Sequence, residues 1–129
     1  MIIIPDITEE ICTNLLKDIA EVSQNNNSIK FFRKDFIRMT MWLLIIKNNL
    51  MGQKINIEDI ARAVAPISKI SKPSLRLILE NAKHKGYIKF TSNLDDHRSI
   101  NVEPEAITIK EFKFWIEKFL KENDKIKLD

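Results

Sequence analysis

Apolar residues recur at spacings of three and four along most of this chain, which is the period of a helix that buries one face. After Gly86 the spacing changes to two, as in β-strands. We therefore expect a mainly α fold with a small antiparallel β hairpin. The expected helices lie near 6–24, from between Ile29 and Asp35 to about Leu50, 56–64, 71–85 and from Pro104 onward, and the expected strands at 87–90 and 98–102.

Residues 71–102 carry the clearest boundaries. Ser71 can cap a helix, and Pro73 suits its first turn because the missing N–H would have no partner there. Gly86 can adopt the left-handed conformation that ends such a helix. A polar tip at 93–97 then joins the two strands. This order of helix, glycine and hairpin is the layout of a winged helix-turn-helix, in which the hairpin is the wing.

The helix at 71–85 has two distinct faces. Its inward positions are Leu75, Ile78, Leu79 and Ala82, and its outward positions are Lys72, Ser74, Arg76, Leu77, Glu80 and Asn81. Leu77 leaves two interpretations open: it meets a thymine methyl group, or the helix is rotated so that Leu77 joins the core. The inward residues expected in the hairpin are Ile88, Phe90, Ile100 and Val102.

The segments before this unit have less distinct limits. Asp6 or Thr8 can cap the first helix. The segment Lys54–Ile57 could pair as a third strand beside the hairpin, and Ala65–Ile70 forms a turn longer than compact helix-turn-helix units use. An extra helical turn at Ser68–Ile70 is the alternative. The second helix is expected to be central and covered on most sides, and its apolar positions include Phe32, Phe36, Leu43 and Ile46.

Both terminal helices carry apolar stripes. The first stripe has near-heptad spacing and consists of Ile7, Ile11, Leu15, Ile19 and Val22. The second is rich in aromatic residues and consists of Ile109, Phe112, Trp115, Ile116, Phe119 and Leu120. Each stripe has to be buried against the chain's own core or against a second subunit. A homodimer would cover both.

Positive charge is concentrated in the middle of the chain. Residues 30–98 carry 14 Lys and Arg against 6 Asp and Glu, while the whole chain has a net charge of only +3. A basic centre favours a nucleic-acid partner, although an ordinary lysine-rich surface is the alternative interpretation. The same two interpretations, phosphate contact or solvated face, apply to the cluster of Lys30, Arg33, Lys34 and Arg38.

Three short segments together resemble the MarR family of transcription regulators. They are Lys83-His84-Lys85-Gly86-Tyr87-Ile88, then Asp95-Asp96-His97-Arg98 in the wing, and Pro104-Glu105 at the start of the last helix. The resemblance covers most of the chain. It implies a single winged-helix domain, 1–129, in which 1–28 and 105–129 form a dimerisation region and 30–103 a DNA-binding core. The recognition helix would enter the major groove and the wing the minor groove.

The resemblance also implies particular site residues. The expected DNA-binding residues are Ser71, Lys72, Ser74, Arg76, Lys83, Lys89, Asp96, His97 and Arg98. The expected dimerisation residues are Ile11, Leu15, Ile19, Phe112, Trp115, Ile116 and Phe119. The expected partners are double-stranded DNA and a second copy of the chain. Relatives often bind small aromatic compounds between the two regions, but no residue here specifies such an effector.

Other functions find little support in the sequence. There is no nucleophile-and-base arrangement, no glycine-rich phosphate loop and no close pair of metal-ligating residues, so we expect neither an enzyme nor a metal or cofactor. Cys12 is expected to be a small buried hydrophobic residue and not a redox sensor. Without a membrane-spanning run or a signal sequence, a cytoplasmic location is expected. The main rival to DNA binding is a winged-helix module that holds an acidic protein partner.

The wing provides a test. Asp96 and Arg98 are two residues apart, so on a strand they project from one face and the carboxylate can steer the guanidinium. In the MarR family this pair aims the arginine at the minor groove, where narrow A·T-rich DNA has enhanced negative potential. Arg98→Ala should then weaken DNA binding by about 1–3 kcal/mol with nearly unchanged thermal stability, measured by polarisation titration and thermal melting.

Asp96→Ala is the informative companion variant. It should weaken DNA binding, by less than Arg98→Ala, although simple charge counting predicts tighter binding when a carboxylate is lost. Tighter binding by Asp96→Ala, together with unchanged binding by Arg98→Ala, would show that the wing does not read the minor groove.

Overall fold

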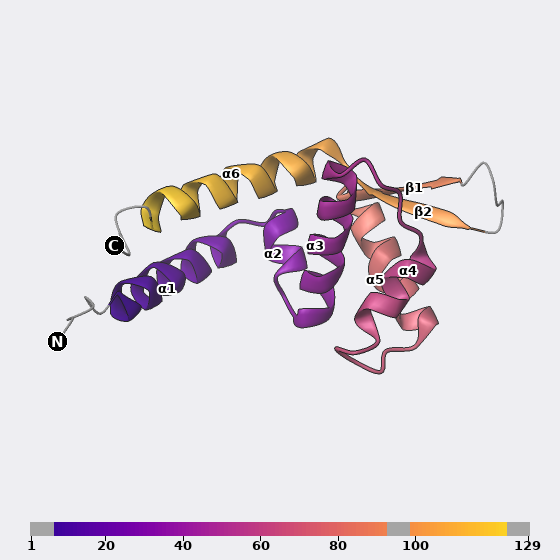
Figure 1. The fold of residues 1–129 in the computed structure, drawn as a ribbon, viewed down its shortest axis with the longest axis horizontal. Coiled ribbons are helices and arrows are strands. Elements are labelled where there is room, and N and C mark those ends of the chain that lie inside the picture. The colour runs from indigo at the N-terminus through magenta and orange to yellow at the C-terminus, as the bar shows by residue number, and fades with distance from the viewer. Residues whose placement is uncertain (1–6, 93–98, 124–129) are drawn as a thin grey trace.

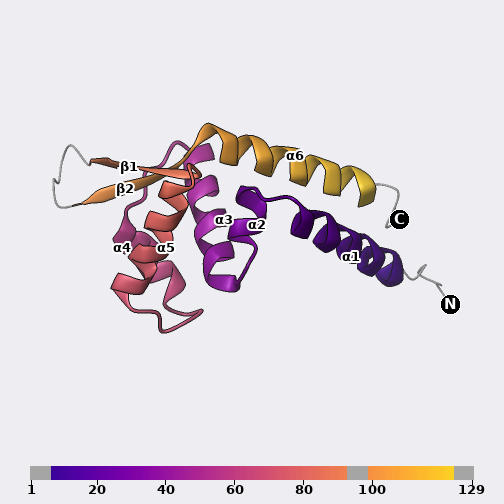
Figure 2. The same cartoon turned by 180° about the vertical axis from the view of Figure 1, so that it is seen from behind.

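The computed structural model describes residues 7–92 and 99–123. Within these residues it contains six helices and one two-stranded antiparallel sheet, which confirms the expected mainly α fold with a β hairpin. The elements are α1 (Thr8–Gln24), α2 (Ser28–Phe32), α3 (Phe36–Leu50), α4 (Ile57–Val64), α5 (Lys72–His84), β1 (Ile88–Ser92), β2 (Ile100–Pro104) and α6 (Ala106–Asn123). Figures 1 and 2 show α1 and α6 extending side by side from a body formed by the other elements. In the described part of the chain, no helix is both long enough and apolar enough to cross a membrane.

The start of α1 differs from the expectation. Thr8 is already the first helical residue, and Ile7 occupies the cap position without a side-chain hydrogen bond. The prediction that Thr8 caps the helix is therefore wrong, and Asp6 lies outside the described residues. Glu9 and Glu10 in the first turn instead place negative charge at the positive end of the helix dipole.

The long second helix that the pattern predicted is in fact two helices. The chain turns between α2 and α3, and the side chain of Asp35 caps α3 by accepting a hydrogen bond from the backbone N–H of Arg38 at 2.8 Å. A continuous helix would place Phe32 and Phe36 on one face, since residues four apart are neighbours there. The turn separates them, so Phe32 is buried while Phe36 is 76% exposed. The prediction of one helix that carries both Phe32 and Phe36 is therefore wrong.

One side of α3 faces away from the core. Met41, Trp42, Ile45 and Ile46 are buried and Leu44 is half-buried, whereas Leu43 is 47% exposed. Only one residue of the apolar run 41–46 is therefore exposed, which confirms the prediction that this part of the helix is covered on most sides. The buried residues of α3 occupy two adjoining faces, and Leu43 projects from the opposite one.

Trp42 lies at the centre of an aromatic cluster that joins three helices. Its ring stacks on Phe32 of α2 with the centroids 6.3 Å apart, and it contacts Phe112 at 5.1 Å and Trp115 at 5.6 Å, both on α6. Each such aromatic pair contributes about 0.5–1.5 kcal/mol beyond its buried area. Two aromatics of the expected dimerisation stripe thus pack against the core of their own chain.

The hairpin pairs in the register Ile88↔Pro104, Phe90↔Val102 and Ser92↔Ile100. Ile88 and Val102 are buried, as predicted, whereas Phe90 and Ile100 are half-buried.

The third strand expected at Lys54–Ile57 is reduced to a single bridge. Asn56 pairs with Asn101 there, and the N–H of Val102 donates to the carbonyl oxygen of Ile55 at 2.8 Å.

The turn between α4 and α5 is long, as expected. After Val64 the chain makes a hydrogen-bonded turn in which the carbonyl oxygen of Val64 accepts from the N–H groups of Ile67 and Ser68, at 2.8 and 3.1 Å. Ser68–Ile70 has no helical structure, so the alternative of an extra helical turn there is wrong.

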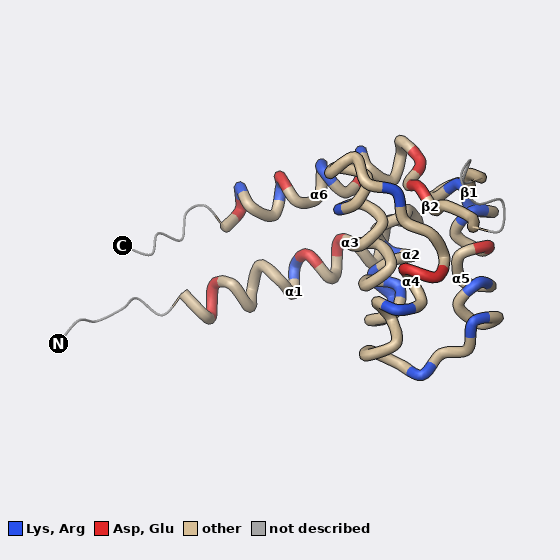
Figure 3. The backbone as a smooth tube through the Cα atoms, turned by 45° about the vertical axis from the view of Figure 1, so that its right-hand side comes forward, with Lys and Arg blue, Asp and Glu red and all other residues tan. Residues whose placement is uncertain are grey.

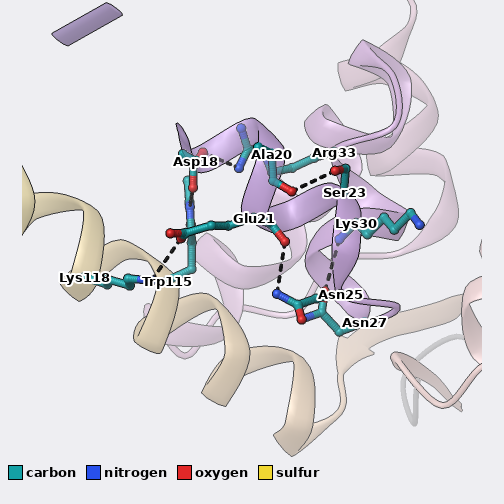
Figure 4. Close-up of polar contacts among 10 residues, drawn as sticks. All are labelled: Asp18, Ala20, Glu21, Ser23, Asn25, Asn27, Lys30, Arg33, Trp115 and Lys118. Carbon is teal, nitrogen blue, oxygen red and sulfur yellow. Dashed lines mark hydrogen bonds and ion pairs between the residues drawn. The ribbon is translucent and has the colours of Figure 1, made fainter. Parts of the chain in front are cut away.

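The arm formed by α1 and α6 is joined to the body by polar contacts that the apolar stripes did not suggest. Asp18 of α1 is only 7% exposed, and its carboxylate accepts hydrogen bonds from Nη1 of Arg33 and Nε1 of Trp115, each at 2.7 Å (Figure 4). Beside it, Lys118 donates to Glu21 at 2.9 Å. Asp18 therefore links α1 to α6 and to the residue that follows α2.

These contacts change the face that α1 presents. Leu15 and Ile19 are 41% and 55% exposed, since the side of α1 that carries Asp18 is the one turned toward α6. Ile11, Ile116 and Phe119 are half-buried. The role of these residues in dimerisation stays a prediction. Cys12 is exposed on α1, so the prediction that it is buried is wrong.

Removing the Asp18 carboxylate should destabilise the fold. Asp18→Ala leaves Arg33 and Trp115 without their acceptor in a nearly buried place, so the free energy of unfolding should fall by about 2–3 kcal/mol in urea titrations followed by circular dichroism. Glu21→Ala is a matched control from the same helix, because it breaks the exposed contact to Lys118 and should leave that free energy unchanged. Equal losses from the two variants would contradict the special role of Asp18.

Candidate nucleic-acid interface

Local sequence sets the limits of α5. Ser71 caps it by accepting a hydrogen bond from the N–H of Ser74 at 3.2 Å, and Pro73 lies in the first turn. Gly86 has a φ of 81°, the left-handed conformation expected to end the helix, and the N–H of Tyr87 closes the end on the carbonyl oxygen of Ala82 at 3.0 Å. These features match the predicted helix to within one residue.

The two faces of α5 are also as predicted. Leu75, Leu79 and Ala82 are fully buried, and Ile78 is half-buried at the edge. The predicted outward residues Lys72, Ser74, Arg76, Leu77, Glu80 and Asn81 are all exposed, and so are Ser71 and Lys83, which were also expected to bind DNA. With 67% of its surface exposed, Leu77 is outside the core, so the rotated-helix interpretation is wrong.

Three cations of α5 contact neighbouring groups. Nζ of Lys72 lies 2.9 Å from Glu58 of α4, Nε of Arg76 lies 3.2 Å from Glu80, and Nζ of Lys83 lies 5.0 Å from the ring centre of Phe90. Exposed ion pairs contribute only about 0–1 kcal/mol, so a phosphate group can replace the carboxylates at little cost. Figure 3 shows Lys and Arg on α5 and on the loop that leads to it.

The base of the wing is tied to the helix-turn-helix. Asn56 caps α4 with its side chain, because Oδ1 accepts a hydrogen bond from the N–H of Asp59 at 2.8 Å. The side-chain Nδ2 of Asn56 donates to Oγ of Ser99 at 3.0 Å. Lys89 is exposed on β1, opposite Glu103 of β2. The expected wing residues Asp96, His97 and Arg98 lie outside the described residues.

A pocket of about 610 Å³ lies beside this face, between α1, α2, α3 and α5. The basic cluster of the sequence, together with Lys85, supplies its cations, which are Lys30, Arg33, Lys34, Arg38 and Lys85. Its apolar and remaining polar lining comes from Ile19, Val22, Phe31, Tyr87, Ser23, Asn26 and Asn81. The cluster thus borders a concave site and is not simply a solvated face.

Two groups in this pocket have unusual surroundings. The guanidinium of Arg38 lies 5.5 Å from the ring centre of Phe31, and its Nε is buried without a hydrogen-bond partner among the described residues. Burial, and secondarily the negative charge of Glu111, raises the pKa of the Tyr87 phenol. Tyr87 therefore keeps its proton, and its capacity to donate a hydrogen bond, at neutral pH.

Sequence reasoning found the basic cluster but missed the pocket. The cluster itself was the only sequence signal, because the apolar walls other than Phe31 come from α1 and from Tyr87, which lie far from the cluster along the chain.

Known proteins share the fold of this chain but little of its sequence. No protein-family model matches the sequence, and no curated protein matches it. Among solved structures, NadR in complex with 4-hydroxyphenylacetate superposes with a TM-score of 0.58 at 17% identity, over 92% of this chain and 72% of that one. A Staphylococcus aureus MepR–DNA complex gives 0.54 at 17% identity, over 93% and 81%. The haem sensor PefR from Streptococcus agalactiae, in complex with haem, gives 0.52 at 15% identity, over 91% and 76%.

These neighbours are MarR-family regulators. This chain has their winged-helix fold. The likeness confirms the fold class that the helix, glycine and hairpin order predicted. Within that fold α5 is the second helix of the helix-turn-helix and the β1–β2 hairpin is the wing.

Proposed function

We propose that this protein is a DNA-binding transcription regulator of the MarR type, which acts on double-stranded DNA as a homodimer. The outward face of α5 is the observation that carries the proposal. It presents three exposed cations, two of which form exposed ion pairs, and it lies beside a hairpin whose base is anchored to the helix-turn-helix. In this arrangement α5 would enter the major groove and the wing the minor groove.

Two further observations support the proposal. MepR, which has the same fold, has been solved in complex with DNA. Leu15, Leu16 and Ile19 of α1 are 41–68% exposed, an apolar surface that a second copy of the chain could cover. A dimer would place two copies of α5 on successive major grooves and so favour a nearly palindromic site.

DNA binding can be tested with random duplex DNA at several salt concentrations. The logarithm of affinity should fall linearly with the logarithm of salt, with a slope of about −0.9 per phosphate contact. Lys72→Ala and Lys83→Ala should each reduce the steepness by about one, whereas Lys17→Ala, an exposed lysine of α1, is the matched control and should leave it unchanged. The readout is fluorescence polarisation.

The rival interpretation makes the opposite prediction. A winged-helix module that holds an acidic protein partner should show negligible affinity for DNA even at low salt. The two-fold dimer has its own test, because a footprint that covers a single asymmetric half-site would contradict it.

The pocket supports a small-molecule effector. Five cations surround walls formed by Phe31, Tyr87 and aliphatic side chains, which suits an aromatic carboxylate, and NadR of the same fold was solved with 4-hydroxyphenylacetate. Two of these cations, Arg33 and Arg38, also pair with Asp18 and Asp35. Such a ligand would contact α5 through Asn81 and Lys85.

Titration calorimetry with 4-hydroxyphenylacetate as the probe tests the pocket. Arg38→Met keeps the length of the side chain but loses the charge, so it should weaken binding by about ten- to a hundredfold. The uncharged amide of the same compound is the control ligand and should bind no better to wild type than to Arg38→Met. Equal affinity of wild type for acid and amide would contradict a carboxylate site.

A further inference from the structure

Leu77 is an apolar residue in a place where the fold does not need one. Residues two apart on a helix differ by about 200° in direction, so Leu77 points away from the buried Leu75 and Leu79. It is 67% exposed in the middle of α5, the element proposed to contact DNA. The packing of α5 is complete without it.

Leu77 borders a hollow of mixed chemistry. The depression has a volume of about 590 Å³ and is lined by Leu77, Ile78, Glu80, Asn81 and His84 of α5 and by Arg38 of α3. Glu80, Asn81 and His84 are exposed, so a carboxylate, an amide and an imidazole that can donate or accept hydrogen bonds flank the leucine. An exposed apolar contact beside such groups fits the mixed chemistry of base edges better than it fits a purely apolar partner.

Charge decides between the occupants of this surface. Lys72, Arg76 and Lys83 outnumber Glu80 on the exposed surface of α5, which therefore carries a net positive charge. A polyanion would meet this charge favourably. In the major groove of duplex DNA, the apolar group at the base edges is the 5-methyl group of thymine.

We infer that Leu77 determines sequence specificity by contacting the 5-methyl group of a thymine in the major groove. This inference rests on the proposed DNA-binding function and adds to it the identity of one base. Leu77 carries no charge, so it contributes to the choice of sequence and not to the attraction of phosphate.

Replacement of thymine by deoxyuridine tests the contact, because it removes the methyl group and leaves the Watson–Crick edge intact. A preferred site is first selected from a random duplex library with the full-length protein, and its thymines are then replaced one at a time. At one position of each half-site the affinity should fall about fourfold, the effect of removing one buried methyl-sized group.

Variants of Leu77 complete the cycle. Leu77→Ala should bind the selected site about tenfold more weakly than wild type, with an unchanged salt slope, and should bind the thymine and deoxyuridine sites equally well. Leu50→Ala is the matched control, because it removes another exposed leucine, at the end of α3. This variant should keep both the affinity of wild type and its fourfold preference for thymine.

The outcomes separate the inference from the function on which it rests. If wild type prefers its selected site but tolerates deoxyuridine at every position, or if Leu77→Ala keeps the preference for the methyl group, the inference is overturned and DNA binding stands. If wild type has no affinity for the random duplexes, both fall. Because the central comparison uses unmodified protein on two DNAs, it does not depend on how any variant folds.

Discussion

The carboxylate of Asp18 is the contact on which the arrangement of the terminal helices depends. A carboxylate that is only 7% exposed pays a large desolvation cost, and here two donors offset it, the Arg33 guanidinium and the Trp115 indole N–H. Both bonds have a preferred direction, unlike apolar packing. They therefore fix which side of α1 faces α6, and they leave Leu15 and Ile19 on the open side.

The same contact reaches the pocket. Arg33 donates a hydrogen bond to Asp18, and its guanidinium carbon lies 5.0 Å from the ring centre of Trp115. The same residue lines the pocket. The pocket wall thus includes side chains of α1, α2 and α5, and a ligand bound there would contact both the arm and the helix proposed to read DNA. If the binding of an effector is coupled to the binding of DNA, that coupling would have to cross only the width of the pocket.

The proposed DNA surface combines weak and strong constraints. Its cations sit in exposed contacts that are easily exchanged for phosphate, whereas the backbone that carries them is held by the Ser71 cap, the Gly86 stop and the buried residues of α5. Adjustable side chains on a rigid helix suit a surface that first meets DNA through charge and then reads base edges. Leu77 and Asn81 lie on the part of α5 that would do the reading.

The sequence by itself determined the elements whose limits depend on neighbouring residues. The extent of α5, its buried and exposed faces, the glycine stop and the two strands all follow from caps, φ preferences and periodicity, which act over a few positions. Tertiary structure alone decided the rest. Phe36 is exposed because the chain turns at Asp35. Phe112 and Trp115 of the last helix pack against Trp42 in the core of the same chain. Asp18 is hydrogen-bonded to Trp115, which lies far from it in the sequence. The pocket arose in the same way, because a concave site made of four helices exists only once contacts between distant segments have set their spacing.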